Sequence, residues 1–277
     1  MIEPTTYFLP ALVLIFGLMI GSFFNVLIYR LPRNESVVWP GSHCPDCRNR
    51  LKLWHNIPVI SYLFLRGACA FCRKKVSLRY PVVEIVTALL ALWLWFSLGT
   101  QSMTGVSWWR DLYTIARMLS LLILLPVSLI DLRHYIIPDA ITIGGLIAGL
   151  ALSFIPGDLT PLQAVLGMAA GGGSLYCVGL FGEYVLRKED SMGGGDIKLM
   201  AFLGAFWGWQ TVLMGIVFAS FMGALVGIGM IILGALKKDR HIPFGPFLAA
   251  GCWTAVLYGD YLLRSYIAFI DAGLTGY

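Results

Sequence analysis

Long apolar stretches alternate with short polar stretches along most of the chain, and the alternation is interrupted only once. A helix needs about 20 apolar residues to cross the hydrocarbon core of a bilayer. On this basis the sequence predicts eight membrane helices, over residues 7–29, 81–98, 112–130, 140–155, 162–186, 197–209, 211–236 and 248–270. The sixth of these is short for a crossing. The expected fold is therefore an all-α polytopic membrane protein.

The interruption is one long polar stretch that follows the first apolar segment. It divides the chain into three predicted parts. These are a first membrane helix in residues 1–30, a small polar domain in residues 31–80, and a core of seven membrane helices in residues 81–277.

Composition supports a membrane protein and fixes its predicted orientation. Charged residues make up only 13% of the 277 residues, against about 25% in soluble domains. If eight helices alternate, all but three of the 20 lysines and arginines lie on the side of residues 31–80, the exceptions being Arg110, Arg117 and Arg264. The positive-inside rule makes that side cytoplasmic and places both termini outside. The net charge of +5 is thus explained by membrane-flanking residues, and no nucleic-acid partner is expected.

Four of the six cysteines lie in the polar domain as two close pairs. The pairs are Cys44 with Cys47 and Cys69 with Cys72, separated by 21 residues. Two such pairs can supply the four thiolates of a tetrahedral zinc site. A redox-active dithiol is the weaker alternative. Because four cysteines leave no position for a bound water, we expect a structural zinc that stabilises a domain with little hydrophobic core.

Two aspartates lie at the ends of apolar stretches on the predicted cytoplasmic side. Asp196 follows Gly193, Gly194 and Gly195, and Asp131 ends the segment over residues 112–130. Two carboxylates that share one water can act as base and acid in aspartic proteolysis. A glycine-rich connector whose aspartate caps the next helix is the structural alternative.

Several other interpretations of these acids stay open. Asp139, after Pro138, competes with Asp131, although its position before residues 140–155 favours a helix cap. A transporter could use Asp131 and Asp196 to relay protons or bind a cation, but its acids would lie near mid-membrane and no inverted repeat is visible. A zinc-containing scaffold that recruits partners would leave the two acids without a role.

The sequence resembles the prepilin peptidase (type IV leader peptidase) family of type IV pilus and type II secretion systems. The motifs that carry the resemblance are GSFFNVLIYRLP at 21–32, CPDC at 44–47, CAFC at 69–72, RYPVVE at 79–84, IDLRHYIIPD at 130–139, SMGGGDIKLM at 191–200 and IPFGPFLA at 242–249. The stretch GGGD matches the GxGD motif, which presenilin-type intramembrane proteases share more distantly.

The resemblance implies a bifunctional enzyme of the bacterial inner membrane. It implies that Asp131 and Asp196 cut the leader of a prepilin or pseudopilin after a glycine on the cytoplasmic face. The new N-terminus is then methylated with S-adenosylmethionine. Nothing in the chain resembles a Rossmann-type methyltransferase. Asn25, Glu84 and Lys198 are the candidate residues for the methyl donor, because they are polar, lie at the predicted cytoplasmic boundary and belong to the matching motifs.

We also expect the apolar helix of the substrate to enter laterally from the lipid bilayer and lie against the glycine-rich helices. Small residues allow helices to approach closely.

Overall fold

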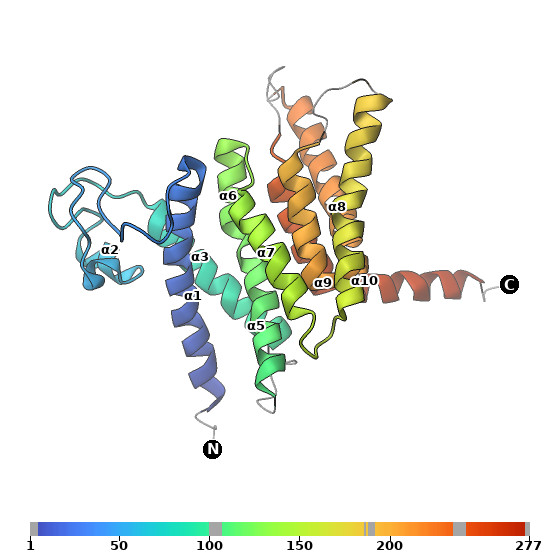
Figure 1. Ribbon diagram of the computed structural model, residues 1–277, viewed down its shortest axis with the longest axis horizontal. Helices are drawn as coiled ribbons and strands as arrows, with labels where there is room; N and C mark the ends of the chain where they lie inside the picture. Colours follow the sequence, from blue (N-terminus) through green and yellow to red (C-terminus); the bar gives the residue numbers. More distant parts are fainter. Residues whose placement is uncertain (1–4, 100–106, 186, 188–191, 235–241, 275–277) are drawn as a thin grey trace. The chain divides into compact units, whose positions relative to one another are not determined.

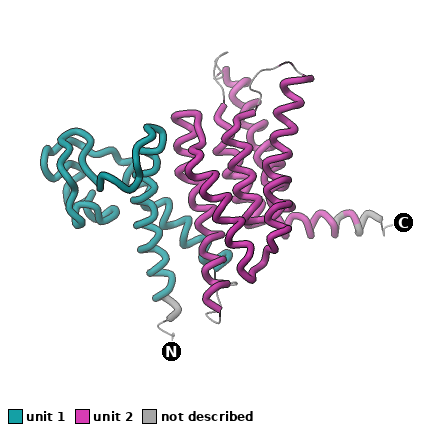
Figure 2. Tube along the Cα trace, in the orientation of Figure 1, with its two compact units in different colours: residues 1–105 teal, residues 106–277 magenta. Residues whose placement is uncertain are grey.

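A computed structural model describes residues 5–99, 107–185, 187, 192–234 and 242–274. The described residues are helical apart from turns and two isolated β-bridges. They form two compact units, Met1–Gly105 and Val106–Tyr277, which Figure 2 shows in separate colours. Each unit is described by itself. The predicted basic turn at residues 237–241 lies outside the described residues.

The first unit contains two long helices and the polar segment between them. Its elements are α1 (Thr5–Arg30), η1 (Leu31–Arg33), η2 (Leu53–Asn56), α2 (Ile60–Phe64), α3 (Arg79–Leu94) and η3 (Trp95–Gly99). α1 packs closely on α3 because Gly17 and Gly21 lack side chains. A Cβ atom at Gly21 would come within 2.6 Å of the Cα atom of Glu84. This contact holds Glu84 of α3 directly against α1.

The second unit is a helical bundle, shown from green to red in Figure 1. Its helices are α5 (Trp108–Leu122), α6 (Leu124–His134), α7 (Asp139–Leu152), α8 (Pro161–Tyr184), α9 (Gly194–Ile232) and α10 (Gly245–Leu274). α8 and α9 make the closest contact, since a Cβ atom at Gly204 would lie 2.0 Å from the carbonyl oxygen of Gly167. Glycine is needed at both positions, as in other small-residue helix interfaces of membrane proteins.

Three of the predicted helices have different boundaries in the structure. The stretch over residues 112–130 falls in two helices, α5 and α6, which meet at Ile123. Pro126, which has no N–H group to donate, lies in the first turn of α6. The stretch over 197–209 and the described helical part of the stretch over 211–236 both lie in α9, which ends at Ile232. Gly208 (φ 76°, ψ 172°) interrupts its helical backbone. Only glycine adopts such angles readily, so the break lies at Gly208, before the predicted boundary at residue 210.

Five of the described helical segments are long and apolar enough to cross a membrane. They are Phe8–Arg33, Arg79–Gly99, Trp108–His134, Pro161–Tyr184 and Gly194–Ile232. The apolar helix α7 is shorter. The structure therefore supports an all-helical polytopic membrane protein, but it does not confirm the predicted number of eight crossings.

Candidate active site

Asp131 lies in the last turn and a half of α6, and its side chain is buried. Its Oδ2 atom accepts a hydrogen bond of 2.9 Å from the backbone N–H of Gly245, the first residue of α10. A Cβ atom at position 245 would lie 2.6 Å from the same oxygen. A side chain at this position would therefore require the Asp131 carboxylate or the start of α10 to move.

Asp196 lies in the first turn of α9, where Gly193 is the N-cap residue. A Cβ atom at Gly193 would come within 2.7 Å of Asp196 Oδ2, and one at Gly195 would come within 2.8 Å of Ile137. The glycines thus let the chain pass close to the carboxylate. Gly194 has no neighbour within 4 Å of a Cβ position. Among the described residues, the buried Oδ1 atom of Asp196 has no hydrogen-bond partner.

Both aspartates line one cavity of about 240 Å³. Its other lining residues are Tyr135, Ile136, Ile137, Asp139, Gly193, Gly194 and Gly195. The two carboxyl groups are near enough for the charge of one to act on the other. The helix packing of the second unit therefore brings together the two acids that the sequence places 65 positions apart. A buried carboxylate at a membrane helix is costly unless it is paired or used, so two of them in one cavity indicate a functional site.

Asp139 differs from these two acids in its surroundings. It lies on the rim of the cavity with 57% of its side chain exposed, and its two oxygens contact Lys198 Nζ at 2.7 and 2.9 Å. The expected helix cap is wrong, because Pro138 is the N-cap residue of α7 and no side chain caps the helix. Asp139 instead belongs to the first turn and forms an exposed ion pair.

The role of Gly245 in holding Asp131 is not predicted from the sequence. The motif over residues 242–249 contributes to the family resemblance, but its spacing suggests no contact with an acid 114 positions away. A glycine next to a proline at the start of an apolar helix is the only local signal. That signal does not identify the partner.

Comparison with known proteins gives consistent matches over most of the chain. A family model described as the bacterial peptidase A24 N-terminal domain matches residues 15–98, and one described as the type IV leader peptidase family matches residues 118–228. Prepilin leader peptidase/N-methyltransferases are similar along nearly their full length. The protein of Aeromonas hydrophila is 36% identical, covering 95% of both chains. That of Pseudomonas putida is 37% identical, covering 95% of this chain and 94% of its own. No solved structure matches the chain significantly.

The chain belongs to the type IV leader peptidase family. It is accordingly a membrane enzyme with peptidase and N-methyltransferase activities. The match to the leader peptidase model includes both Asp131 and Asp196 but ends before Gly245. The match to the N-terminal model covers the four cysteines together with Asn25 and Glu84.

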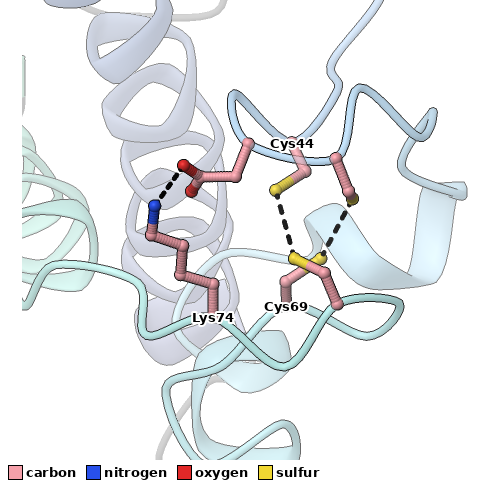
Figure 3. A network of polar contacts seen from close by, with 6 residues as sticks. Cys44, Cys69 and Lys74 are labelled. Atoms are coloured by element: carbon pink, nitrogen blue, oxygen red, sulfur yellow. Dashed lines mark hydrogen bonds and ion pairs between the residues drawn. The ribbon is translucent and has the colours of Figure 1, made fainter.

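The four cysteines of this leader peptidase family member form one compact cluster in the first unit (Figure 3). All four sulfur atoms lie within 4.8 Å of one another. Cys44 and Cys72 are 3.9 Å apart, and Cys47 and Cys69 are 4.0 Å apart. Four thiolates around zinc, each at about 2.3 Å, lie about 3.8 Å from each other. A disulfide would require about 2.05 Å. The donor set therefore fits a tetrahedral metal ion.

The two cysteine pairs have matching backbone conformations. The backbone carbonyl oxygen of Cys44 accepts a hydrogen bond from the N–H of Arg48. The carbonyl oxygen of Cys69 accepts one from the N–H of Arg73 in the same way. Both arginines have positive φ angles, 57° and 58°. The backbone N–H of Cys72 is the main cause that lowers the pKa of the Cys69 thiol to about 7. Although the backbone N–H of Lys74 acts in the opposite direction, burial and the neighbouring thiols raise the pKa of Cys72 to about 11. Metal binding, and not the fold alone, would therefore bring all four cysteines to the thiolate form.

An ion pair between Asp46 and Lys74 links the two turns of the cluster, as Figure 3 shows. The aspartate belongs to the first cysteine pair and the lysine follows the second. Both side chains are substantially exposed, so the pair contributes little stability by itself. The metal-binding geometry therefore depends on the turns and on the ion that they would hold.

The structure separates the three candidate residues for the methyl donor. Asn25 and Glu84 line the same pocket in the first unit. Lys198 lies in the second unit, where it pairs with Asp139. Glu84 Oε2 accepts a hydrogen bond of 2.8 Å from the N–H of Val59, and Asn25 Nδ2 donates one of 3.0 Å to the carbonyl oxygen of Tyr80. The contact with Val59 is not predicted from the sequence.

Proposed function

We propose that this enzyme cleaves the leader of type IV prepilins or pseudopilins after a glycine, using Asp131 and Asp196, and then methylates the new N-terminus with S-adenosylmethionine. The observation that carries the proposal is the single cavity lined by both buried aspartates. The names of the relatives support prepilins as substrates.

The contacts of the two acids suggest different roles. The N–H of Gly245 stabilises a carboxylate at Asp131, so Asp131 takes a proton from the water that attacks the scissile carbonyl carbon. Asp196, whose Oδ1 atom has no partner among the described residues, carries the proton of the pair. It donates this proton to the leaving nitrogen as the peptide C–N bond breaks. Asp131 is then protonated and Asp196 ionised, and proton exchange with solvent restores the starting state.

The position of the acids favours a peptidase over a transporter. Asp131 lies near the end of α6 and Asp196 in the first turn of α9. Ion-coupled transporters bind their ions near the middle of the membrane, at broken helices. Acids at helix ends are suited to a peptide bond at the junction between a polar leader and an apolar helix.

Methylation follows cleavage, because it requires the free amino group that cleavage produces. S-adenosylmethionine supplies a methyl group on a sulfonium, which the amino nitrogen attacks while the C–S bond breaks and one proton is released. The chain itself must hold the donor, exclude water and orient the amine.

We further propose eight membrane crossings, with α9 divided at Gly208 and with α7 and α10 as short or less apolar crossings. The distribution of lysine and arginine favours a cytoplasmic position for the cysteine domain and both aspartates, and an outer position for both termini. The inner membrane follows from this arrangement and from the secretion and pilus systems of the family. The apolar helix of the substrate could then enter laterally from the lipid, which would bring the junction with its polar leader to the two aspartates.

We propose zinc as the metal of the cysteine cluster, in a structural role. The support is the set of four sulfurs at distances that match a tetrahedral site. Domains of this size with little hydrophobic core commonly depend on such a metal.

The experiment that tests the function uses the full-length chain in detergent or lipid and a purified prepilin. Mass analysis of the product, with and without S-adenosylmethionine, reads both activities. We expect loss of the leader in both reactions and an added methyl group only with the donor. An uncut prepilin would contradict the peptidase assignment, and a cut but unmethylated product would contradict the methyltransferase assignment.

A further inference from the structure

A pocket of the first unit lies where α1, α3 and the cysteine-containing segment meet. Its volume is about 290 Å³, at the small end of the range for pockets that bind small molecules. All its lining residues belong to Ser22–Glu84, so it is distinct from the cavity of the two aspartates. The peptidase mechanism uses none of them.

Three polar side chains that line this pocket are buried or partly buried. Asn25 is 3% exposed, and its Oδ1 atom has no hydrogen-bond partner among the described residues. The same holds for the buried Nδ1 atom of His55. Glu84, 8% exposed, adds a carboxylate. Leaving the Asn25 and His55 atoms unpaired away from water is unfavourable. A ligand that offers a hydrogen-bond donor to Asn25 and positive charge to Glu84 would suit the pocket.

Glu84 also holds a strained backbone at the wall of the pocket. Val59 has φ 59° and ψ −48°, which is strongly disfavoured for a β-branched residue. Its N–H is bonded to Glu84 Oε2 at 2.8 Å. Strained residues of this kind persist where the surrounding structure fixes them, and they are frequent at ligand sites. The arrangement fixes the carboxylate and the loop as one unit.

The remaining walls supply aromatic rings and positive charges. Tyr29, Tyr62 and Tyr80 line the pocket. Three basic residues line it as well, namely Arg30, Lys74 and Lys75. A sulfonium or ammonium group is attracted both to aromatic faces and to carboxylate or amide oxygens. A purine ring packs on flat aromatic surfaces, and a lysine can pair with a carboxylate. S-adenosylmethionine carries all of these groups: two cationic centres, an adenine and a carboxylate.

We propose that this pocket, with Asn25 and Glu84 as its central polar residues, is the binding site for the methyl donor. The proposal rests on the N-methyltransferase activity and adds the location of the donor. Glu84 and Asn25 face the cationic end of the donor, and the tyrosines face its adenine. The proposal does not include Lys198, which belongs to the second unit and pairs there with Asp139.

The test is a direct binding measurement with S-adenosylmethionine and the full-length chain, by calorimetry and without prepilin. We expect Asn25→Leu and Glu84→Gln each to weaken binding about tenfold or more, since each removes a contact with a charged group. Glu183→Gln, at an exposed acid of α8, is the matched control, and Asp196→Asn tests independence from the peptidase site. Both should bind the donor like the parent protein. Metal content shows whether each variant is folded, and leader cleavage gives a second check for every variant except Asp196→Asn, which is expected to lose cleavage.

The outcomes separate the two proposals. Tight binding by the parent and equally tight binding by Asn25→Leu and Glu84→Gln would overturn the pocket assignment and leave the activity intact. No binding by the parent would contradict the methyltransferase function itself. If either variant loses its metal or its cleavage activity, ultraviolet crosslinking of the donor to the parent protein decides. Labelled peptides within residues 22–84 support the pocket, and labels confined to residues beyond 106 overturn it.

Discussion

The cysteine cluster and the aspartate cavity are built in opposite ways. The four cysteines lie within 29 positions of each other, and each pair is shaped by its own short turn with an arginine at positive φ. The two aspartates come from separate helices, and the residue that holds one of them, Gly245, comes from a third. A local turn can be formed by a few residues and a metal ion, whereas the cavity exists only when the bundle is packed. Substitutions in the two regions should therefore have separable effects.

The largest expected effect is on cleavage, from replacing either aspartate. Asp131→Asn and Asp196→Asn should each reduce the rate of prepilin cleavage by about 10⁴-fold. The reason is that removing one member of a catalytic unit costs nearly as much rate as removing the whole unit. Metal content should not change, because the cysteine turns do not depend on these acids. Mass analysis of prepilin and elemental analysis of zinc provide the two measurements. Substantial processing by either variant, in folded protein, would refute the aspartic mechanism.

A smaller loss is expected from Gly245→Ala. The added Cβ atom would lie 2.6 Å from Asp131 Oδ2, so the aspartate or the start of α10 must move. A misplacement of about 1 Å can cost about 100-fold in rate. The control is Gly229→Ala in α9, where a Cβ atom meets nothing within 4 Å. Equal cleavage rates for the two variants would show that the Gly245 contact does not position Asp131.

The converse effect is expected from Cys44→Ser. Losing one of four thiolates should weaken zinc binding by at least about tenfold and lower the stability of the cysteine segment, since metal binding is coupled to folding. Cleavage chemistry should change much less. Cys177→Ser, at an exposed cysteine outside the cluster, should retain the metal. A fully stable Cys44→Ser variant without metal would contradict a structural zinc.

The smallest effect is expected from Asp139→Asn. Its partner, Lys198, and Asp139 itself are largely exposed, and such pairs contribute about 0–1 kcal/mol. Cleavage should therefore fall by no more than about fivefold. The same prepilin assay checks it. Complete loss of cleavage would mean that Asp139, rather than Asp131, is the first acid of the pair.

Properties that depend on local spacing could be predicted from the sequence. The apolar runs indicate the helices, and the paired cysteines indicate a metal cluster, because both patterns are set within a few turns of chain. The motif with Gly193, Gly194 and Gly195 likewise indicates a close approach at Asp196. The predicted break between residues 209 and 211 is nearly correct, since Gly208 is itself the residue with the unusual backbone angles. The number of membrane crossings stays a prediction, because length and hydropathy alone do not decide whether a short helix such as α7 crosses the membrane.

The sequence by itself determined the class of protein, the cysteine cluster and the two candidate acids. Only the tertiary structure decided which distant residues surround them. It brought Gly245 to Asp131, joined Asn25 and Glu84 in one pocket, and placed Lys198 against Asp139 instead. The physical reason is that helix packing, and not sequence distance, sets these contacts. Glycines such as Gly21, Gly167 and Gly204 let the backbones of two helices come into direct contact. The amino-acid sequence does not specify which helix packs against each of these glycines.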